Sequence, residues 1–276
     1  MQARATGRIS EEQFRAAEDF ALRETIQRME ETGSPVITDG EQTKPSFATV
    51  ISASALSFCY PQNGLNGYGR EAFLEDLVPE AERDVRECLR AGAFCVQIDF
   101  TEGRRALKLD PSGELLNSLV DLNNRVLDRF SAADQQKVGV HTCPGGDQDS
   151  THSADVDYAA LLPGLFSLNA GAFYIQLASE PDRPRVLRAI AEHAKPGQRI
   201  FAGVIDPIDP RIETPEEVRD RVLEAAAYIG PDRLGTCDDC GFAPFGDDTS
   251  TSRQTAFAKI RARVEGTQLA ASKLGL

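Results

Sequence analysis

The fold of this chain is decided by one stretch, residues 200–229, which reads IFAGVIDPIDPRIETPEEVRDRVLEAAAYI. Its apolar start, residues 200–205, predicts a buried strand. Thr214 then has the side chain of a helix N-cap, Pro215 stands at the first helical position, and Glu217 completes a capping box. A buried strand followed by a capped helix is the unit from which parallel sheets are built.

The same alternation extends along the whole chain in both directions. A capping box at Ser10 begins a helix that Gly33 ends. Further helices are expected over residues 70–91, 115–130, 158–168 and 252–264. Strands are expected over residues 35–38, 47–58, 94–99, 138–141, 173–177, 200–205 and 233–236.

A right-handed series of such units closes most naturally as a barrel of eight strands. The chain opens on a helix that precedes its first expected strand, so we predict an α/β fold, a TIM-type (β/α)8 barrel that lacks or replaces its first strand. Residues 1–276 then form a single domain, opened at the missing strand or closed there by the N-terminal tail or a partner. A doubly wound open sheet is the alternative, but the chain has no G-x-G-x-x-G dinucleotide fingerprint.

Composition limits the class of protein further. The chain has 276 residues, of which 41% are hydrophobic, and a formal net charge of -13. This acidity argues against nucleic acid as a partner, and no apolar run is long enough for a membrane span. With no signal-peptide pattern, we expect a cytoplasmic protein whose six cysteines are thiols rather than disulfides.

Three side chains suggest a metal site. His141 and Cys143 end an apolar strand and point to the same side of it, because side chains alternate faces with period two. Cys240 lies far downstream, and imidazole and thiolate are the ligands that zinc prefers. Cys237 and Cys240 form a C-x-x-C with no second such pair, which disfavours a structural zinc ribbon. An isolated His-x-Cys is also compatible with ordinary packing of a buried thiol.

Polar side chains follow the ends of the other expected strands, where barrel enzymes carry their catalytic groups. Turn chemistry also explains a carboxylate beside glycine, and a rigid loop explains carboxylates between prolines. The polar segment 145–157 reads as a mobile loop whose histidine is either solvated or a general acid. The strand-end candidates are Asp39, Glu41, Asp99, Gln176, Glu180, Asp206, Asp209 and His152.

In their order, these motifs resemble the catalytic barrel of cobalamin-independent methionine synthase. The resemblance covers nearly the whole chain and is closest to the short, single-barrel members of that superfamily. It is carried by residues 36–41 (VITDGE), 96–99 (VQID), His141-x-Cys143, Gly203-Val204-x-Asp206, 213–217 (ETPEE) and 239–242 (DCGF).

The resemblance implies a zinc ion held by His141, Cys143 and Cys240, with an open position for a substrate thiol. It also implies that Glu41 and Asp99 bind the amino group of homocysteine. The expected partners are a small-molecule thiol and an alkyl donor, with a homo-oligomer as an option.

This chain departs from the family pattern at three points. Gln176 stands where the family has its glutamate ligand, so the fourth ligand is that amide, Glu180 or nothing, and Gln176 becomes a substrate-binding candidate. Ile208 stands where the family has its histidine acid, and the acid role passes to Asp206, Asp209 or His152. Asp99 is followed by Phe-Thr-Glu instead of Glu-Pro, and the chain has no Trp, which argues against methyltetrahydrofolate as the donor.

The sequence therefore predicts a zinc-dependent transferase that activates a homocysteine-like thiol for attack on a methyl or other small alkyl donor. One alternative is a metal-free lyase or decarboxylase on the same barrel, in which Asp99 and Asp206 act with Lys44, Arg104 and Arg105 on a small acidic substrate. A second is a barrel without activity that serves as a binding subunit.

Overall fold

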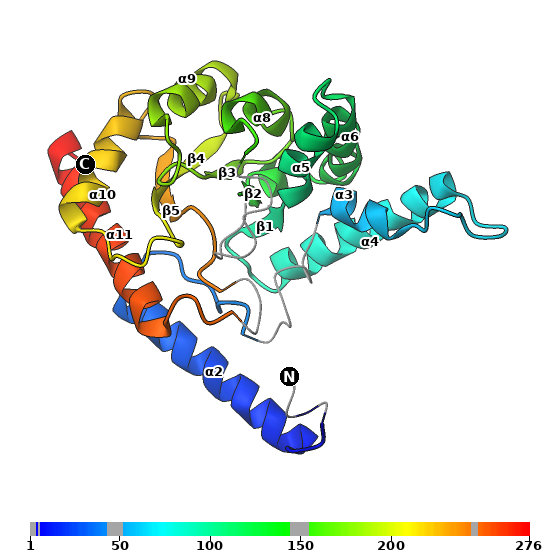
Figure 1. The fold of residues 1–276 in the computed structure, drawn as a ribbon, viewed down its shortest axis with the longest axis horizontal. Coiled ribbons are helices and arrows are strands. Elements are labelled where there is room, and N and C mark those ends of the chain that lie inside the picture. The colour runs from blue at the N-terminus through cyan, green and yellow to red at the C-terminus, as the bar shows by residue number, and fades with distance from the viewer. Residues whose placement is uncertain (1–3, 5, 43–51, 144–154, 244–247) are drawn as a thin grey trace.

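The computed structural model describes residues 4, 6–42, 52–143, 155–243 and 248–276. A parallel sheet with the strand order β1-β2-β3-β4-β5 lies at its centre, and helices surround it (Figure 1). The strands are β1 (Val96–Asp99), β2 (Val138–Thr142), β3 (Ala172–Ile175), β4 (Arg199–Ile205) and β5 (Leu234–Asp238).

The helical elements are α2 (Glu11–Glu31), α3 (Ala53–Leu56), η2 (Ser57–Cys59), α4 (Arg70–Arg90), α5 (Thr101–Leu109), α6 (Glu114–Leu127), α7 (Ala132–Gln135), α8 (Tyr158–Leu165), α9 (Arg183–His193), α10 (Pro215–Ala226) and α11 (Arg253–Leu274). Two helices, α2 and α10, begin at the predicted capping residues, whereas α3, α5 and α7 were not expected from the sequence. Both capping boxes are formed, at Ser10 and at Thr214. Among the described residues, no helix is long and apolar enough to cross a membrane.

The two faces of the sheet have different environments. The face that packs on the surrounding helices is the core, and its side chains have exposures of 0% to 1% (Val138, Val140, Phe173, Ile175, Ile200, Ala202). The opposite face carries Tyr174 and Phe201, whose rings stack at 4.8 Å. Gly139 makes room for the first ring, because a Cβ there would lie 2.6 Å from it. Since β2 alternates with period two, His141 lies on this second face as well.

The described residues do not form the first two expected strands. Residues 35–38 form no strand, and Val36 and Ile37 are 49% and 36% exposed. In the expected strand 47–58, residues 47–51 lie outside the described residues and 53–59 are helical. An apolar run becomes a strand only when a neighbour pairs with its backbone, and among the described residues β1 pairs only with β2. The single-domain organisation stays a prediction.

A buried ion pair fixes the loop after β4. Lys259 of α11 and Glu213 are both almost completely buried, and Lys259 Nζ lies 2.8 Å from Glu213 Oε2. Lys259 Nζ also donates to the carbonyl of Asp206, and the Asp206 N–H donates to Glu213 Oε1. The ion pair therefore bonds to both the N–H and the carbonyl group of Asp206.

We expect the Lys259→Met variant to lose about 3–5 kcal/mol of unfolding free energy, because the buried Glu213 carboxylate loses its hydrogen-bonded cation and keeps only Arg221, whose Nη1 lies 3.7 Å from Glu213 Oε1. Lys273→Met is the matched control, since Lys273 is exposed near the end of the same helix. Urea denaturation of both variants measures the difference. Equal midpoints for the two variants would contradict the role of the pair.

Candidate metal centre

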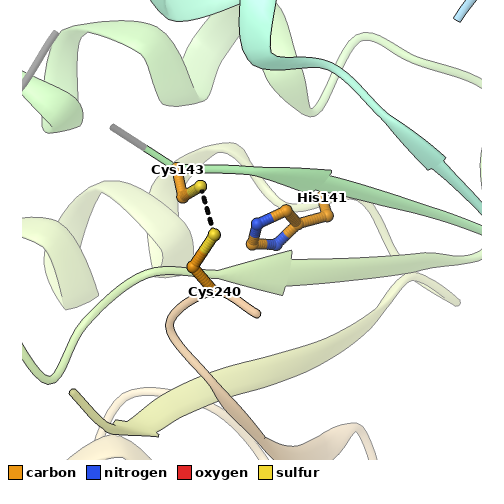
Figure 2. Close-up of side chains that lie close together, drawn as sticks. All are labelled: His141, Cys143 and Cys240. Carbon is orange, nitrogen blue, oxygen red and sulfur yellow. Dashed lines mark hydrogen bonds between the residues drawn. The ribbon is translucent and has the colours of Figure 1, made fainter. Parts of the chain in front are cut away.

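The structure brings together the three predicted ligands. His141 lies in β2, Cys143 follows the strand directly, and Cys240 lies two residues beyond β5. One ligand atom from each side chain lies within 4.8 Å of the others, and the two Sγ atoms are 2.8 Å apart. Figure 2 shows the imidazole of His141 turned toward the two sulfurs. The cluster therefore joins one nitrogen and two sulfur donors from the carboxyl ends of β2 and β5, which are separated in the sheet by β3 and β4.

The electrostatics of the cluster suit a cation. His141 Nε2 is buried and has no hydrogen-bond partner among the described residues. Burial alone would lower the pKa of His141, but the Cys143 sulfur, Asp99 and Asp239 raise it to about 9. The hydrogen bond with Cys143, together with burial, raises the pKa of the Cys240 thiol. Two such thiols ionise together only when a positive charge offsets theirs. An unpartnered imidazole nitrogen and two thiols therefore fit zinc.

Of the two carboxylates predicted to bind substrate, Asp99 lies next to His141 and Glu41 is linked to the site only through Asp99. Asp99 pairs with His141 in the register of β1 and β2. Burial raises the pKa of Asp99, and the charge of Glu41 raises it further, so the structure brings Glu41 into its neighbourhood. Asp99 Oδ2 accepts from Thr101 Oγ1, whereas Asp99 Oδ1 is buried with no partner in the described part of the chain. Glu41 has a φ of 55°, a backbone conformation that is costly for a residue other than glycine.

Gln176 is held by a polar network instead of standing free. Its Oε1 accepts from Arg104 Nη1 at 3.2 Å, and its Nε2 donates to Glu180 Oε1 at 2.8 Å and to Ser179 Oγ at 3.0 Å. Arg104 is 2% exposed, and its guanidinium lies over the ring of Tyr158. Glu180 is not part of the histidine–cysteine cluster. The network thus orients the Gln176 amide beside the cluster.

A small pocket adjoins the two sulfurs. Its wall includes Asp206, as predicted, and Ile208. The Asp206 carboxylate accepts from the Ile208 N–H at 2.9 Å, which forms the turn after β4. The complete lining is Cys143, Gln176, Ser179, Asp206, Pro207, Ile208, Asp239 and Cys240.

Cys237 and Asp209 have other partners and are not part of the cluster. Cys237, the partner of Cys240 in the C-x-x-C, donates to the carbonyl of Phe201. Asp209 accepts from the Arg211 N–H and lies 3.7 Å from its guanidinium. Lys44 and His152 lie outside the described residues.

Sequence reasoning gave no role to Glu102, which lies in the first turn of α5. The hydroxyls of Ser52 and Ser54 both donate to its Oε1. Ser54 is held in turn by the buried Asn123 through two hydrogen bonds. Burial raises the pKa of Glu102 to about 6, and Asp99 adds to the effect. A glutamate three residues after Asp99 was visible in the sequence, but its serine partners come from a segment expected to be a strand.

Together the fold and the site define a TIM-type α/β barrel with an imidazole–dithiol cluster at the carboxyl ends of its strands. The chain belongs to the family described as cobalamin-independent synthase, catalytic domain, whose sequence model matches residues 48–267. This confirms the predicted superfamily.

Solved structures show the same barrel. A B12-independent methionine synthase from Shewanella sp. W3-18-1, in complex with selenomethionine, superposes with a TM-score of 0.72 over 96% of this chain and 91% of that chain, at 18% identity. A putative B12-independent methionine synthase from Listeria monocytogenes gives 0.69 over 97% and 92%, also at 18% identity. At this identity the likeness establishes the fold alone, and it confirms the predicted TIM-type class.

The curated relatives are longer than this chain, which matches only part of each of them. The methionine synthase of Sulfurisphaera tokodaii is 25% identical over 199 residues, or 72% of this chain and 49% of that protein. The methionine synthase of Methanothermobacter thermautotrophicus is 24% identical over 222 residues, or 79% and 59%. The uncharacterized protein YxjH of Bacillus subtilis is 25% identical over 204 residues, or 70% and 52%. The chain thus spans about half the length of the curated relatives it matches.

The raised pKa of Glu102 predicts a dependence of stability on pH. A carboxyl pKa of about 6, against 4.5 for the ordinary group, means that the folded protein holds this proton more tightly than the unfolded chain. The contribution is therefore complete below pH 4.5 and is lost as the pH rises through about 6. Relative to Glu102→Gln, the wild type should lose about 2 kcal/mol of unfolding free energy across this window.

Urea denaturation of both proteins at a series of pH values measures this difference. Above pH 7 the difference between the two proteins should stay constant, because the Glu102 titration is then complete. Parallel stability curves between pH 4 and pH 7 would contradict the prediction.

Proposed function

We propose that the protein is a zinc-dependent transferase that activates a homocysteine-like thiol for attack on a methyl or other small alkyl donor. The observation that supports this most is the meeting of His141, Cys143 and Cys240, with His141 Nε2 buried and unpartnered in the described part of the chain. Membership of the cobalamin-independent synthase family supports the same reaction class.

His141, Cys143 and Cys240 would hold the zinc ion. Three protein ligands are typical of a catalytic zinc site, because the fourth position stays open for a substrate. Bound there, zinc lowers the pKa of the substrate thiol, so that the thiolate exists at neutral pH. Gln176 lines the pocket beside the two sulfurs, and its amide is oriented by Arg104 and Glu180.

Asp99 and Glu41 would bind the amino group of the thiol substrate. Asp99 pairs with His141 in the sheet, Glu41 is near enough to raise the pKa of Asp99, and the buried Asp99 Oδ1 has no partner among the described residues. A buried carboxylate oxygen without a donor is costly, and an ammonium group would relieve that cost. This pair would therefore select amino thiols over simple thiols.

Asp206 would handle the proton on the donor side. The substrate sulfur forms a bond to the alkyl carbon as the bond between that carbon and the donor breaks, and the donor keeps the electron pair. The substrate thiol would release one proton when it becomes a thiolate, and a basic leaving group would take up one proton, so no net proton is consumed. Asp206, which lines the pocket beside the two sulfurs, would pass that proton to the leaving group and regain one from solvent. Asp239, the second carboxylate of the pocket wall, already accepts four hydrogen bonds.

The metal-free lyase or decarboxylase remains the alternative, and the structure offers it little support. It needs basic side chains around the substrate. Arg105 is exposed, Lys44 lies outside the described residues, and Arg104 is engaged with Gln176 and Tyr158. Activity that survives chelation but is lost in Asp99→Asn would select this alternative.

We expect the protein, purified without chelator, to contain about one zinc ion per chain. Cys240→Ser and His141→Ala should each fall below about half an equivalent, because each removes one of three ligands. Cys237→Ser is the matched control, since this thiol lies outside the cluster, and it should keep the wild-type content. Elemental analysis measures all four proteins, and a content that does not respond to Cys240→Ser would contradict the site.

We expect Asp99→Asn to weaken homocysteine binding to the cobalt-loaded protein by about tenfold to a hundredfold, because a hydrogen bond to a charged group contributes about 1.5–3 kcal/mol. Binding is followed by the absorption of the cobalt–thiolate bond. The control ligand is 4-sulfanylbutanoic acid, which lacks the amino group and should bind both proteins alike. If Asp99→Asn weakens the binding of both ligands equally, Asp99 does not bind the amino group.

A further inference from the structure

The Asp239 carboxylate, immediately before Cys240, is saturated with hydrogen bonds. It is 3% exposed, and all four of its donors come from the segment that follows β3. Oδ1 accepts from the N–H groups of Leu177 and Ala178, both at 2.9 Å. Oδ2 accepts from the N–H and the hydroxyl of Ser179, both at 2.8 Å. Asp239 therefore ties the loop after β5 to the loop after β3.

This connection passes over β4, which lies between β3 and β5 in the sheet. At the crossing point β4 has Gly203, where a Cβ would lie 1.8 Å from Asp239 Oδ1 and 3.0 Å from the Ile175 carbonyl oxygen. No side chain fits in that space. The glycine of β4 and the carboxylate after β5 are thus two parts of one arrangement.

We propose that Asp239 is a positioning residue that sets the Cys240 sulfur at the metal, and that Gly203 provides the space it needs. The inference rests on the proposed zinc site and deepens it. Asp239 N–H donates to the Ile205 carbonyl at 2.9 Å, and Cys240 follows in the loop beyond β5. A metal ligand must be held to within about 0.5 Å, which a loop achieves only with such support.

The chemistry of the four donors requires a carboxylate. An ionised carboxylate only accepts, and it offers about four lone-pair sites, all of which are used here. An asparagine would turn one acceptor into an NH₂ group that faces the N–H of Ser179. The same saturation leaves Asp239 no free oxygen for proton exchange with a substrate, so a positioning role fits better than an acid or base role.

The test compares three variants of the full chain. Asp239→Asn breaks the acceptor pattern, and Gly203→Ala places a methyl group where the carboxylate lies. Asp238→Asn is the matched control, because Asp238 is a neighbouring carboxylate with little exposure that lies 3.2 Å from Arg263 of α11 instead. Zinc affinity is measured by competition with a chromogenic chelator, and ligand geometry by the visible spectrum of the cobalt-loaded protein.

We expect Asp239→Asn and Gly203→Ala to bind zinc about tenfold to a hundredfold more weakly than the wild type, the range typical for residues that orient metal ligands. Their cobalt spectra should shift, with weaker thiolate-to-cobalt absorption. Asp238→Asn should keep the wild-type affinity and spectrum, even if it melts at a lower temperature.

Three other results would contradict either this inference or the proposed function. Wild-type affinity and spectrum in Asp239→Asn would overturn the inference and leave the zinc site intact. If Asp239→Asn and Gly203→Ala are both unfolded in the absence of metal while Asp238→Asn is folded, Asp239 is needed for folding rather than for positioning Cys240. That result would also overturn the inference. A wild type that binds no zinc would overturn the proposed function itself.

Discussion

The parallel pairing of β1 to β5 in register is the constraint on which the rest of this protein depends. Because side chains alternate faces, the pairing of Asp99 with His141 places both side chains on the face of the sheet opposite the helix-packed core. A slip of one residue between β1 and β2 would exchange Val140 for His141 on the helix-packed face. The apolar outer layer, which is almost wholly buried, makes such a slip prohibitively costly. The core therefore fixes the site.

The site in turn concentrates charge where water is scarce. Two thiols, an imidazole and the carboxylates of Asp99 and Asp239 lie close together, and burial raises the pKa of both carboxyl groups. The protein compensates with directed donors: three backbone N–H groups and a hydroxyl for Asp239, and the Arg104 guanidinium for Gln176 and Glu180. His141 Nε2 and Asp99 Oδ1 are buried without a hydrogen-bond partner in the described residues, and we propose these two atoms as contacts for the metal and for the substrate ammonium group.

Much of the fold was predictable because its signals are local. The capping boxes at Ser10 and Thr214 formed as the side chains indicated, and the five central strands lie where apolar runs were found. The run at residues 35–38 and the described part of the run at 47–58, which is helical from residue 53, were predicted wrongly, because apolar character alone does not distinguish a strand from an extended or helical segment. The three metal-ligand candidates converged as expected. Glu102 could not be linked to Ser52 and Ser54, since nothing in their spacing shows that α5 packs on that segment.

By itself, the sequence determined the alternation of strands and helices, the donor types at the strand ends and the family they indicate. These follow from periodicity, capping chemistry and ligand preference, which are properties of short segments. Only the tertiary structure decided that Gln176 is held by Arg104 and that Asp239 reaches across Gly203 to the loop after β3. Such contacts join residues tens of positions apart in the sequence. Their geometry depends on how β3, β4 and β5 pair in the sheet. The sequence shows that a carboxylate precedes Cys240, but only the folded structure brings its four hydrogen-bond donors to it.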